Sequence, residues 1–170
     1  MTISAVQTRL EPAELRDQRS FRDTLGRYPT GVVVIAAGAE DGPVGMTVNS
    51  FTSVSLDPPL IAFCPMRSSA TWAQIKAAGG FAVSLLRLQH EVVARQFSQK
   101  GVDRFAGHEW WMSPTGHPVL AEAMGWLDAA IESVTSAGDH ELVVARVLDW
   151  SAPGEGDPLV FFSGGYRALS

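Results

Sequence analysis

The chain has 170 residues, 46% of them hydrophobic and 18% charged, which supplies one buried core and excludes a globally disordered protein. Its net charge of −5 and isoelectric point near 5.3 exclude the basic surface of a nucleic-acid-binding protein. Cys64 is the single cysteine, so no internal disulfide forms and a reducing, cytoplasmic location is favoured. We expect no signal peptide and no membrane span, because no apolar run nears the ~18 residues that cross a bilayer.

Hydrophobic periodicity divides the chain into many short strands and few helices. In chain order we expect a flexible arm at 1–19, a helix at 20–28 capped by Ser20, strands at 31–37, 44–51 and 60–64, a helix at 68–79, a strand at 81–86, a helix at 89–97, a loop-rich section at 101–116, and strands at 126–136, 141–150 and 159–162. This pattern favours a closed antiparallel barrel over a parallel α/β sheet. With no repeat or linker in view, residues 20–170 are expected to form a single domain.

Several local features sharpen these expectations. The β-branched run 31–37 predicts a strand buried on both faces. Pro58 and Pro59 are expected to interrupt strand pairing, because proline lacks a ladder donor. The four histidines form no cluster with metal-ligand spacing, so no structural metal is expected, and three of them are interpreted as surface residues: His90, His108 and His117.

The segment 45–59 is the most informative stretch. It joins two apolar runs yet is rich in small polar residues, which are Thr47, Asn49, Ser50, Thr52, Ser53 and Ser55. Such residues leave backbone N–H groups approachable, which suits a flat ligand with polar edges. An edge strand with a hydroxyl-rich solvent face is the alternative for the same pattern.

A second hydroxyl cluster, residues 67–71, stands at the predicted start of the helix 68–79. Free N–H groups and the positive end of the helix dipole favour a phosphate there, and Arg67 adds a charge. Plain helix capping is the alternative. A Gly-x-Ser-x-Gly elbow and the Gly-rich phosphate-binding patterns are absent from the sequence.

Six motifs in a fixed order carry a resemblance to a known family. They are Pro29-Thr30-Gly31 with the run 32–35, the segment 44–60, Cys64-Pro65 with Ser68-Ser69-x-Thr71, Asp103-Arg104-Phe105-Ala106-Gly107, Gly138-Asp139-His140, and Gly165-Tyr166-Arg167. From about residue 20 to 168, the sequence resembles the flavin reductases with an FMN-binding split barrel. These are the small components of two-component flavin-dependent monooxygenases.

The resemblance implies a mainly β, Greek-key type split β-barrel that forms a homodimer, binds FMN or FAD, and uses NADH or NADPH as reductant. It implies a partner monooxygenase that receives the reduced flavin, with no nucleic acid or membrane involved. Flavin contacts carried over from the family fall on Met46, Thr47, Val48, Asn49, Ser50, Cys64, Pro65, Ser68, Ser69, Thr71, Arg104 and Phe105. Contacts to the nicotinamide dinucleotide fall on His140, Tyr166 and Arg167, with His140 orienting the nicotinamide rather than moving a proton.

Alternatives stay open at this point. A non-enzymatic flavin carrier or sensor on the same barrel is the second candidate function, and the related pyridoxamine-phosphate oxidase class is a third. Asp103 and Arg104 could form only a surface ion pair. The sequence does not decide FMN against FAD or NADH against NADPH.

Overall fold

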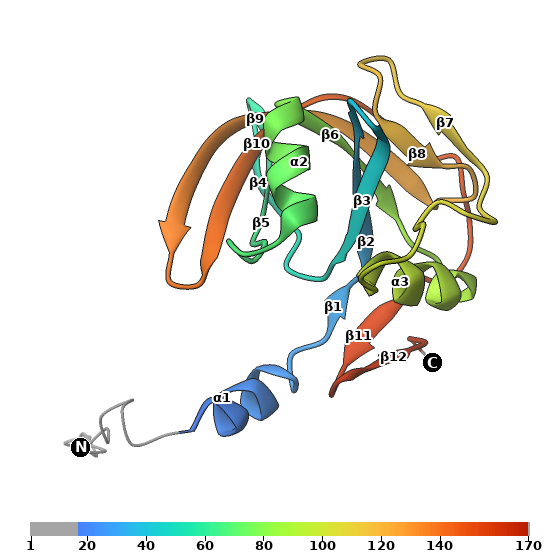
Figure 1. Ribbon diagram of the computed structural model, residues 1–170. Coiled ribbons are helices and arrows are strands. Elements are labelled where there is room, and N and C mark those ends of the chain that lie inside the picture. Colours follow the sequence, from blue (N-terminus) through green and yellow to red (C-terminus); the bar gives the residue numbers. More distant parts are fainter. Residues whose placement is uncertain (1–16, 170) are drawn as a thin grey trace, which may run out of the picture.

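A curved antiparallel sheet forms the body of the computed structural model, which describes residues 17–169 (Figure 1). Seven strands pair in the order β3 (Gly42–Val48), β2 (Val33–Ala39), β6 (Gly80–Leu85), β9 (Gly125–Ala137), β10 (His140–Ser151), β5 (Pro59–Phe63) and β4 (Thr52–Leu56). The edge strands β3 and β4 are not paired with each other in the described chain, so the barrel stays split on that side. The mainly β prediction is confirmed.

Helix α2 (Ala70–Ala78) packs against β2, β3 and β6. Ser69 caps its start by accepting a hydrogen bond from Trp72 N at 3.2 Å, and Gly79 ends it at φ 73°, a left-handed conformation that glycine adopts without strain. Trp72 and Ile75 both face the core, where the Trp72 ring meets Phe63 edge-on with centroids 5.5 Å apart. The predicted helix, its serine cap and its glycine end are confirmed.

Strand β2 separates two hydrophobic clusters because its side chains alternate. Val33 and Ile35 join the cluster around Trp72, whereas Val34 joins the cluster around Phe97. Phe97 belongs to α3 (Glu91–Ser98), which a short 3-10 turn, Leu88–His90, precedes. The prediction that this strand is buried on both faces is confirmed.

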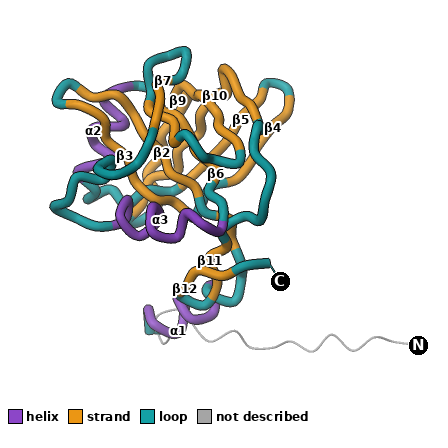
Figure 2. Tube along the Cα trace, turned by 90° about the vertical axis from the view of Figure 1, so that its right-hand side faces the viewer, coloured by secondary structure: helices purple, strands orange, loops and turns teal. Residues whose placement is uncertain are grey.

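Two small sheets lie beside the barrel. One contains β1 (Thr30–Gly31), β11 (Val160–Phe162) and β12 (Gly165–Arg167), and the other pairs β7 (Trp110–Met112) with β8 (Pro118–Leu120). β7, β8 and β12 were not predicted, because three-residue strands show no periodicity of their own. Figures 1 and 2 show that α1 (Gln18–Leu25) and the β11–β12 hairpin project away from the main sheet.

Helix α1 has no buried residue, and Phe21, Leu25 and Tyr28 are exposed to 65%, 56% and 74%. Asp17, not Ser20, is its N-cap: the Asp17 carboxylate accepts from Ser20 N at 2.6 Å, so the helix starts earlier than predicted. Most of the predicted arm at 1–19 lies outside the described residues. Between residues 17 and 169 no helix is long and apolar enough to cross a membrane.

The hydroxyl-rich segment holds one more strand than predicted. β3 ends at Val48, and residues 52–56 form the exposed edge strand β4, so the edge-strand alternative holds for that part. Pro58 and Pro59 do not interrupt pairing, because they lie at the tight turn where Leu56 pairs with Pro59 across the β4–β5 hairpin.

The surface assignment is wrong for two histidines. His90 and His117 are only 7% and 9% exposed. Burial of each ring is tolerated because a ring nitrogen has a backbone donor: Nδ1 of His90 accepts from Arg87 N at 3.2 Å, and Nδ1 of His117 from Gly38 N at 3.4 Å. His108 is half-buried, with Nε2 3.0 Å from Gln96 Oε1.

Candidate functional site

The connection between β3 and β4 is tied to the end of β5 by one hydroxyl. Ser50 Oγ accepts from Cys64 N at 2.9 Å and lies 3.3 Å from Cys64 O, to which it donates. Asn49 and Ser50 are exposed and line an open groove of about 990 Å³. Thr30 lines the same groove, and its buried Oγ1 has no hydrogen-bond partner among the described residues. This groove therefore presents the exposed polar residues Asn49 and Ser50 to a ligand.

The three predicted contacts within β3 point to different sides of the strand. Met46 and Val48 pack on the cluster around Trp72. Thr47 points to α3, where its hydroxyl donates to Ala94 O at 2.7 Å. A ligand along this strand would thus meet its backbone, and the side chains free to contact a ligand are those of the two residues that follow it, Asn49 and Ser50.

Arg104 binds three separate segments of its own chain. Its Nη1 donates to Gly45 O and to Thr71 Oγ1, each at 2.7 Å, and its Nε donates to Gln99 O at 2.9 Å. Partial burial lowers the pKa of Arg104. Asp103 accepts instead from Phe105 N at 3.0 Å, so the surface ion-pair alternative is wrong.

The start of α2 has hydrogen-bond donors without a partner in the helix. The hydroxyl of Thr71 accepts from Arg104, which leaves its own proton for a further acceptor. The first N–H groups of a helix have no partner within the helix, and here Ser69 Oγ takes only that of Trp72. Gly45, Thr71 and Arg104 also line a cavity of about 250 Å³.

The Phe105 ring is packed in the second hydrophobic cluster and has no exposed face toward the start of α2. It is 8% exposed and stacks edge-on between Phe97 and Trp110, with centroids 4.9 and 5.6 Å away. It therefore holds the loop 103–108 on the second hydrophobic cluster.

His140 lies at the turn between β9 and β10, against the segment that precedes α2. Met66 and His140 form an isolated antiparallel bridge, and Arg67 N donates to Asp139 O at 3.0 Å. Asp139 Oδ1 accepts from His140 Nδ1 at 2.7 Å, a bond that lowers the pKa of the Asp139 carboxyl and leaves Nε2 facing away from it. The predicted phosphate region and His140 are thus brought together, since His140 lies against residues 65–67 and Ser68 follows them directly in the chain.

Tyr166 and Arg167 are not brought to His140 within one chain. They belong to β12, which Figure 1 shows well separated from the β9–β10 turn. Arg95 lies over the Tyr166 ring at 5.1 Å from its centroid, and Phe161 packs on it edge-on. Burial raises the pKa of the Tyr166 hydroxyl.

Comparisons with known proteins identify this arrangement. The family model described as a flavin reductase like domain matches residues 25–170. The chain belongs to the flavin reductase family. A flavin reductase from Pseudomonas putida is 43% identical over 155 residues, covering 91% of each chain. The reductase subunit HsaB of a flavin-dependent monooxygenase from Rhodococcus jostii is 38% identical, covering 92% of this chain and 80% of the relative.

A solved flavin reductase structure shares the fold. The NADH:FAD oxidoreductase SgcE6 of Streptomyces globisporus, in complex with NAD and FAD fragments, superposes with a TM-score of 0.87 at 33% identity, covering 95% of this chain and 96% of that one. The family resemblance and the split-barrel fold predicted from sequence are confirmed.

The residues of this flavin reductase fit a flavin phosphate and ring at two places. Thr71 and the amides at the start of α2 suit the phosphate, and the groove beside Asn49 and Ser50 suits the polar edge of a flat ring. No cluster of three His, Cys, Asp or Glu side chains in residues 17–169 would hold a metal ion.

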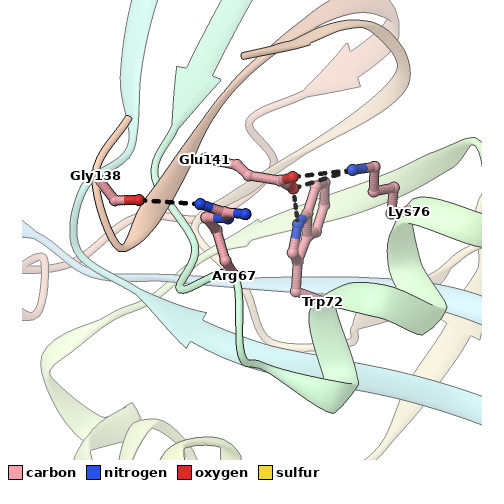
Figure 3. Close-up of polar contacts among 5 residues, drawn as sticks. All are labelled: Arg67, Trp72, Lys76, Gly138 and Glu141. Carbon is pink, nitrogen blue, oxygen red and sulfur yellow. Dashed lines mark hydrogen bonds and ion pairs between the residues drawn. The ribbon is translucent and has the colours of Figure 1, made fainter. Parts of the chain in front are cut away.

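Sequence reasoning missed one polar cluster in the flavin reductase, shown in Figure 3. Glu141 Oε2 accepts from Trp72 Nε1 at 2.6 Å, and Lys76 Nζ lies 3.0 Å from Oε1. Arg67 Nη1 lies 3.4 Å from Gly138 O. The sequence showed Trp72 only as an apolar residue on a buried helix face, and nothing in it places Glu141 opposite α2. Its adjacency to the Gly-Asp-His motif was the one available signal.

Proposed function

We propose that the protein is an NAD(P)H:flavin oxidoreductase that reduces FMN or FAD and delivers the reduced flavin to a partner monooxygenase. The observation that carries the proposal is the contact between two predicted sites. The turn bearing His140 is bonded to residues 65–67, directly before the anion-binding start of α2. One short segment therefore separates a nicotinamide contact from a phosphate contact.

The bound flavin and nicotinamide supply the chemistry, which is hydride transfer from nicotinamide C4 to flavin N5. The chain's residues bind, orient and shield these groups. Backbone N–H groups in 46–50 and the exposed Asn49 and Ser50 would hold the edge of the ring, with Cys64-Pro65 beside them. Ser68, Ser69 and Thr71 would hold the phosphate, with Arg104 supporting Thr71 through its hydrogen bond to the hydroxyl. His140 orients the nicotinamide through Nε2, because Nδ1 is held by Asp139.

A flavin carrier or sensor would not need a nicotinamide contact such as His140 beside the phosphate region. A pyridoxamine-phosphate oxidase activity would need basic groups placed for a second phosphate. Arg104, a half-buried arginine of this region, already donates to three carbonyl or hydroxyl oxygens of its own chain. We therefore rank the reductase first.

A homodimer completes the proposed site. His140 and the pair Tyr166–Arg167 lie apart in one chain, so a second copy is needed to bring them to one nicotinamide. The apolar side chains exposed on α1, Phe21 and Leu25, supply surface for such an association. Residues 20–170 act as one domain in this proposal, in the cytoplasm, where the single Cys64 stays reduced.

The test is anaerobic stopped-flow absorbance with NADH or NADPH and with FMN or FAD in turn. Bleaching of the flavin absorbance band within seconds is expected. The combination of reductant and flavin that reacts fastest identifies the two cofactors. A bound flavin that stays oxidised with both reductants would overturn the reductase in favour of a carrier.

The role of His140 is tested separately. His140→Ala is expected to lower kcat/KM for the reductant by at least ~10-fold, equal to about 1.4 kcal/mol. Glu132→Ala is the matched control, because Glu132 lies on the same strand pair and forms an exposed ion pair with Arg146. Equal activities of the two variants would remove His140 from its proposed role.

A further inference from the structure

The turn that carries His140 has little support of its own. Residues 135–139, at the end of the β9–β10 ribbon, are all exposed. An isolated two-stranded ribbon is marginally stable in water, and exposed backbone hydrogen bonds open readily. The position of His140 must therefore depend on contacts to the rest of the molecule.

Backbone contacts fix the turn on one side. Glu141 N donates to Pro65 O and Arg67 N donates to Asp139 O, both at 3.0 Å, on either side of the bridge between Met66 and His140. These bonds determine the height of His140 along the 65–67 segment. The pairing of β10 with β5, from Val143 to Arg146, continues this backbone restraint, and a side-chain contact adds to it at Glu141.

Glu141 adds a side-chain restraint next to His140. Its side chain is 15% exposed and holds hydrogen bonds at both oxygens, from Trp72 Nε1 at 2.6 Å to Oε2 and from Lys76 Nζ at 3.0 Å to Oε1 (Figure 3). These two bonds, that from Trp72 first, hold the pKa of Glu141 below its usual value, so the carboxylate stays charged. Trp72 itself is 2% exposed and cannot follow a moving partner.

The same helix turn serves the phosphate site. Trp72 N is bonded to the capping Ser69, and Thr71 precedes Trp72 in the chain. Helix α2 therefore connects the proposed phosphate-binding residues at its start with Trp72 and Lys76, which bond to Glu141, the residue next to His140.

We propose that Glu141 is a positioning residue for the reductant. Its hydrogen bonds to Trp72 and Lys76 keep the neighbouring His140 at a fixed distance and angle from the proposed flavin site at the start of α2. This inference rests on the proposed function and adds a residue that does not touch either cofactor. It predicts that Glu141 acts on the reductant only through His140.

The experiment compares wild type, Glu141→Ala, Glu141→Gln, Lys76→Met and the control Glu132→Ala in NADH-dependent flavin reduction. Glu141→Ala is expected to raise KM for NADH roughly 5- to 20-fold, with kcat and the flavin Kd changed less than about 2-fold. Glu141→Gln retains an acceptor for Trp72 Nε1 and is expected to recover most of the loss, and Lys76→Met to show an intermediate effect. Lys76→Met and Glu141→Gln keep the inference testable if Glu141→Ala fails to fold.

The double variant His140→Ala/Glu141→Ala separates positioning from general stability. If Glu141 acts through His140, the double variant matches His140→Ala within about 2-fold. The inference would be overturned if the losses of the two single variants multiply in the double variant, or if Glu141→Ala behaves like Glu132→Ala. The reductase function would stand in both cases. A wild type that reduces no flavin would overturn the proposed function and the inference with it.

Discussion

Replacing Arg104 is expected to weaken both the fold and the proposed phosphate site. The guanidinium reaches β3 at Gly45, α2 at Thr71 and the end of α3 at Gln99, with donor–acceptor distances of 2.7 to 2.9 Å. Arg104→Ala leaves these acceptors without a donor. Arg104→Lys replaces a rigid fork of donors by a single ammonium, which cannot reach all three acceptors at once.

The magnitude follows from the bonds lost. A hydrogen bond to a charged group contributes about 1.5–3 kcal/mol when buried, and Arg104 is only half-buried, so we expect Arg104→Ala to lower the free energy of unfolding by about 2–4 kcal/mol. For a domain of this size, that lowers Tm by roughly 5–15 °C. Arg104→Lys should lose about half as much.

Phosphate binding gives the second readout. Without Arg104 the Thr71 hydroxyl is free to turn away, so the preference for FMN over riboflavin, which lacks the phosphate, should fall about 5- to 10-fold. Flavin fluorescence titrations measure both affinities, and denaturant unfolding measures stability. Arg146→Ala, which breaks an exposed ion pair, is the control and should change stability by less than about 1 kcal/mol. Equal weakening of FMN and riboflavin by Arg104→Ala would refute the phosphate reasoning.

Three further substitutions test other contacts. Ser50→Ala removes both bonds to Cys64 and should cost about 1–2 kcal/mol of unfolding free energy by denaturant titration, with Ser53→Ala, on the exposed edge strand, unchanged. Asp128→Ala leaves the Thr115 N–H and hydroxyl unpaired beside a fully buried position and should cost about 2–4 kcal/mol, whereas Asp128→Asn should cost less. Burial lowers the pKa of His117, so the unfolded chain binds its proton first and stability falls as pH drops below the unfolded value of 6.5. His117→Asn, which retains an acceptor for Gly38 N, should reduce that slope by up to about 1.4 kcal/mol per pH unit, and an unchanged slope between pH 7 and 5 would contradict the assignment.

The sequence predicted most of what local chemistry determines. Helix α2, with Ser69 at one end and Gly79 at the other, follows from capping rules that involve neighbours in the chain. The burial of β2 on both faces follows from the continuous run of apolar, mostly β-branched residues at 32–37. The family resemblance rested on motif order, which needs no knowledge of contacts.

The missed features depend on residues far apart in the chain. The buried His117 ring accepts a hydrogen bond from Gly38, 79 residues away. Glu141 meets Trp72 across 69 residues, and Arg104 meets Gly45 across 59. Such pairs carry no local periodicity or capping signal, so the sequence alone does not predict them.

The order of strands has a consequence for how the chain folds. β2 with β3, and β4 with β5, are hairpins between neighbours in sequence, but the two hairpins meet only through β6, β9 and β10. β9 must pair with β6 and β10 with β5, so the sheet cannot assemble until residues 125–151 have been made. The chain loses the conformational entropy of closing these long loops before the stabilising strand contacts form. Folding should therefore be slow and nearly all-or-none. A chain that ends before residue 125 would expose two unpaired hairpins and aggregate rather than form half a barrel.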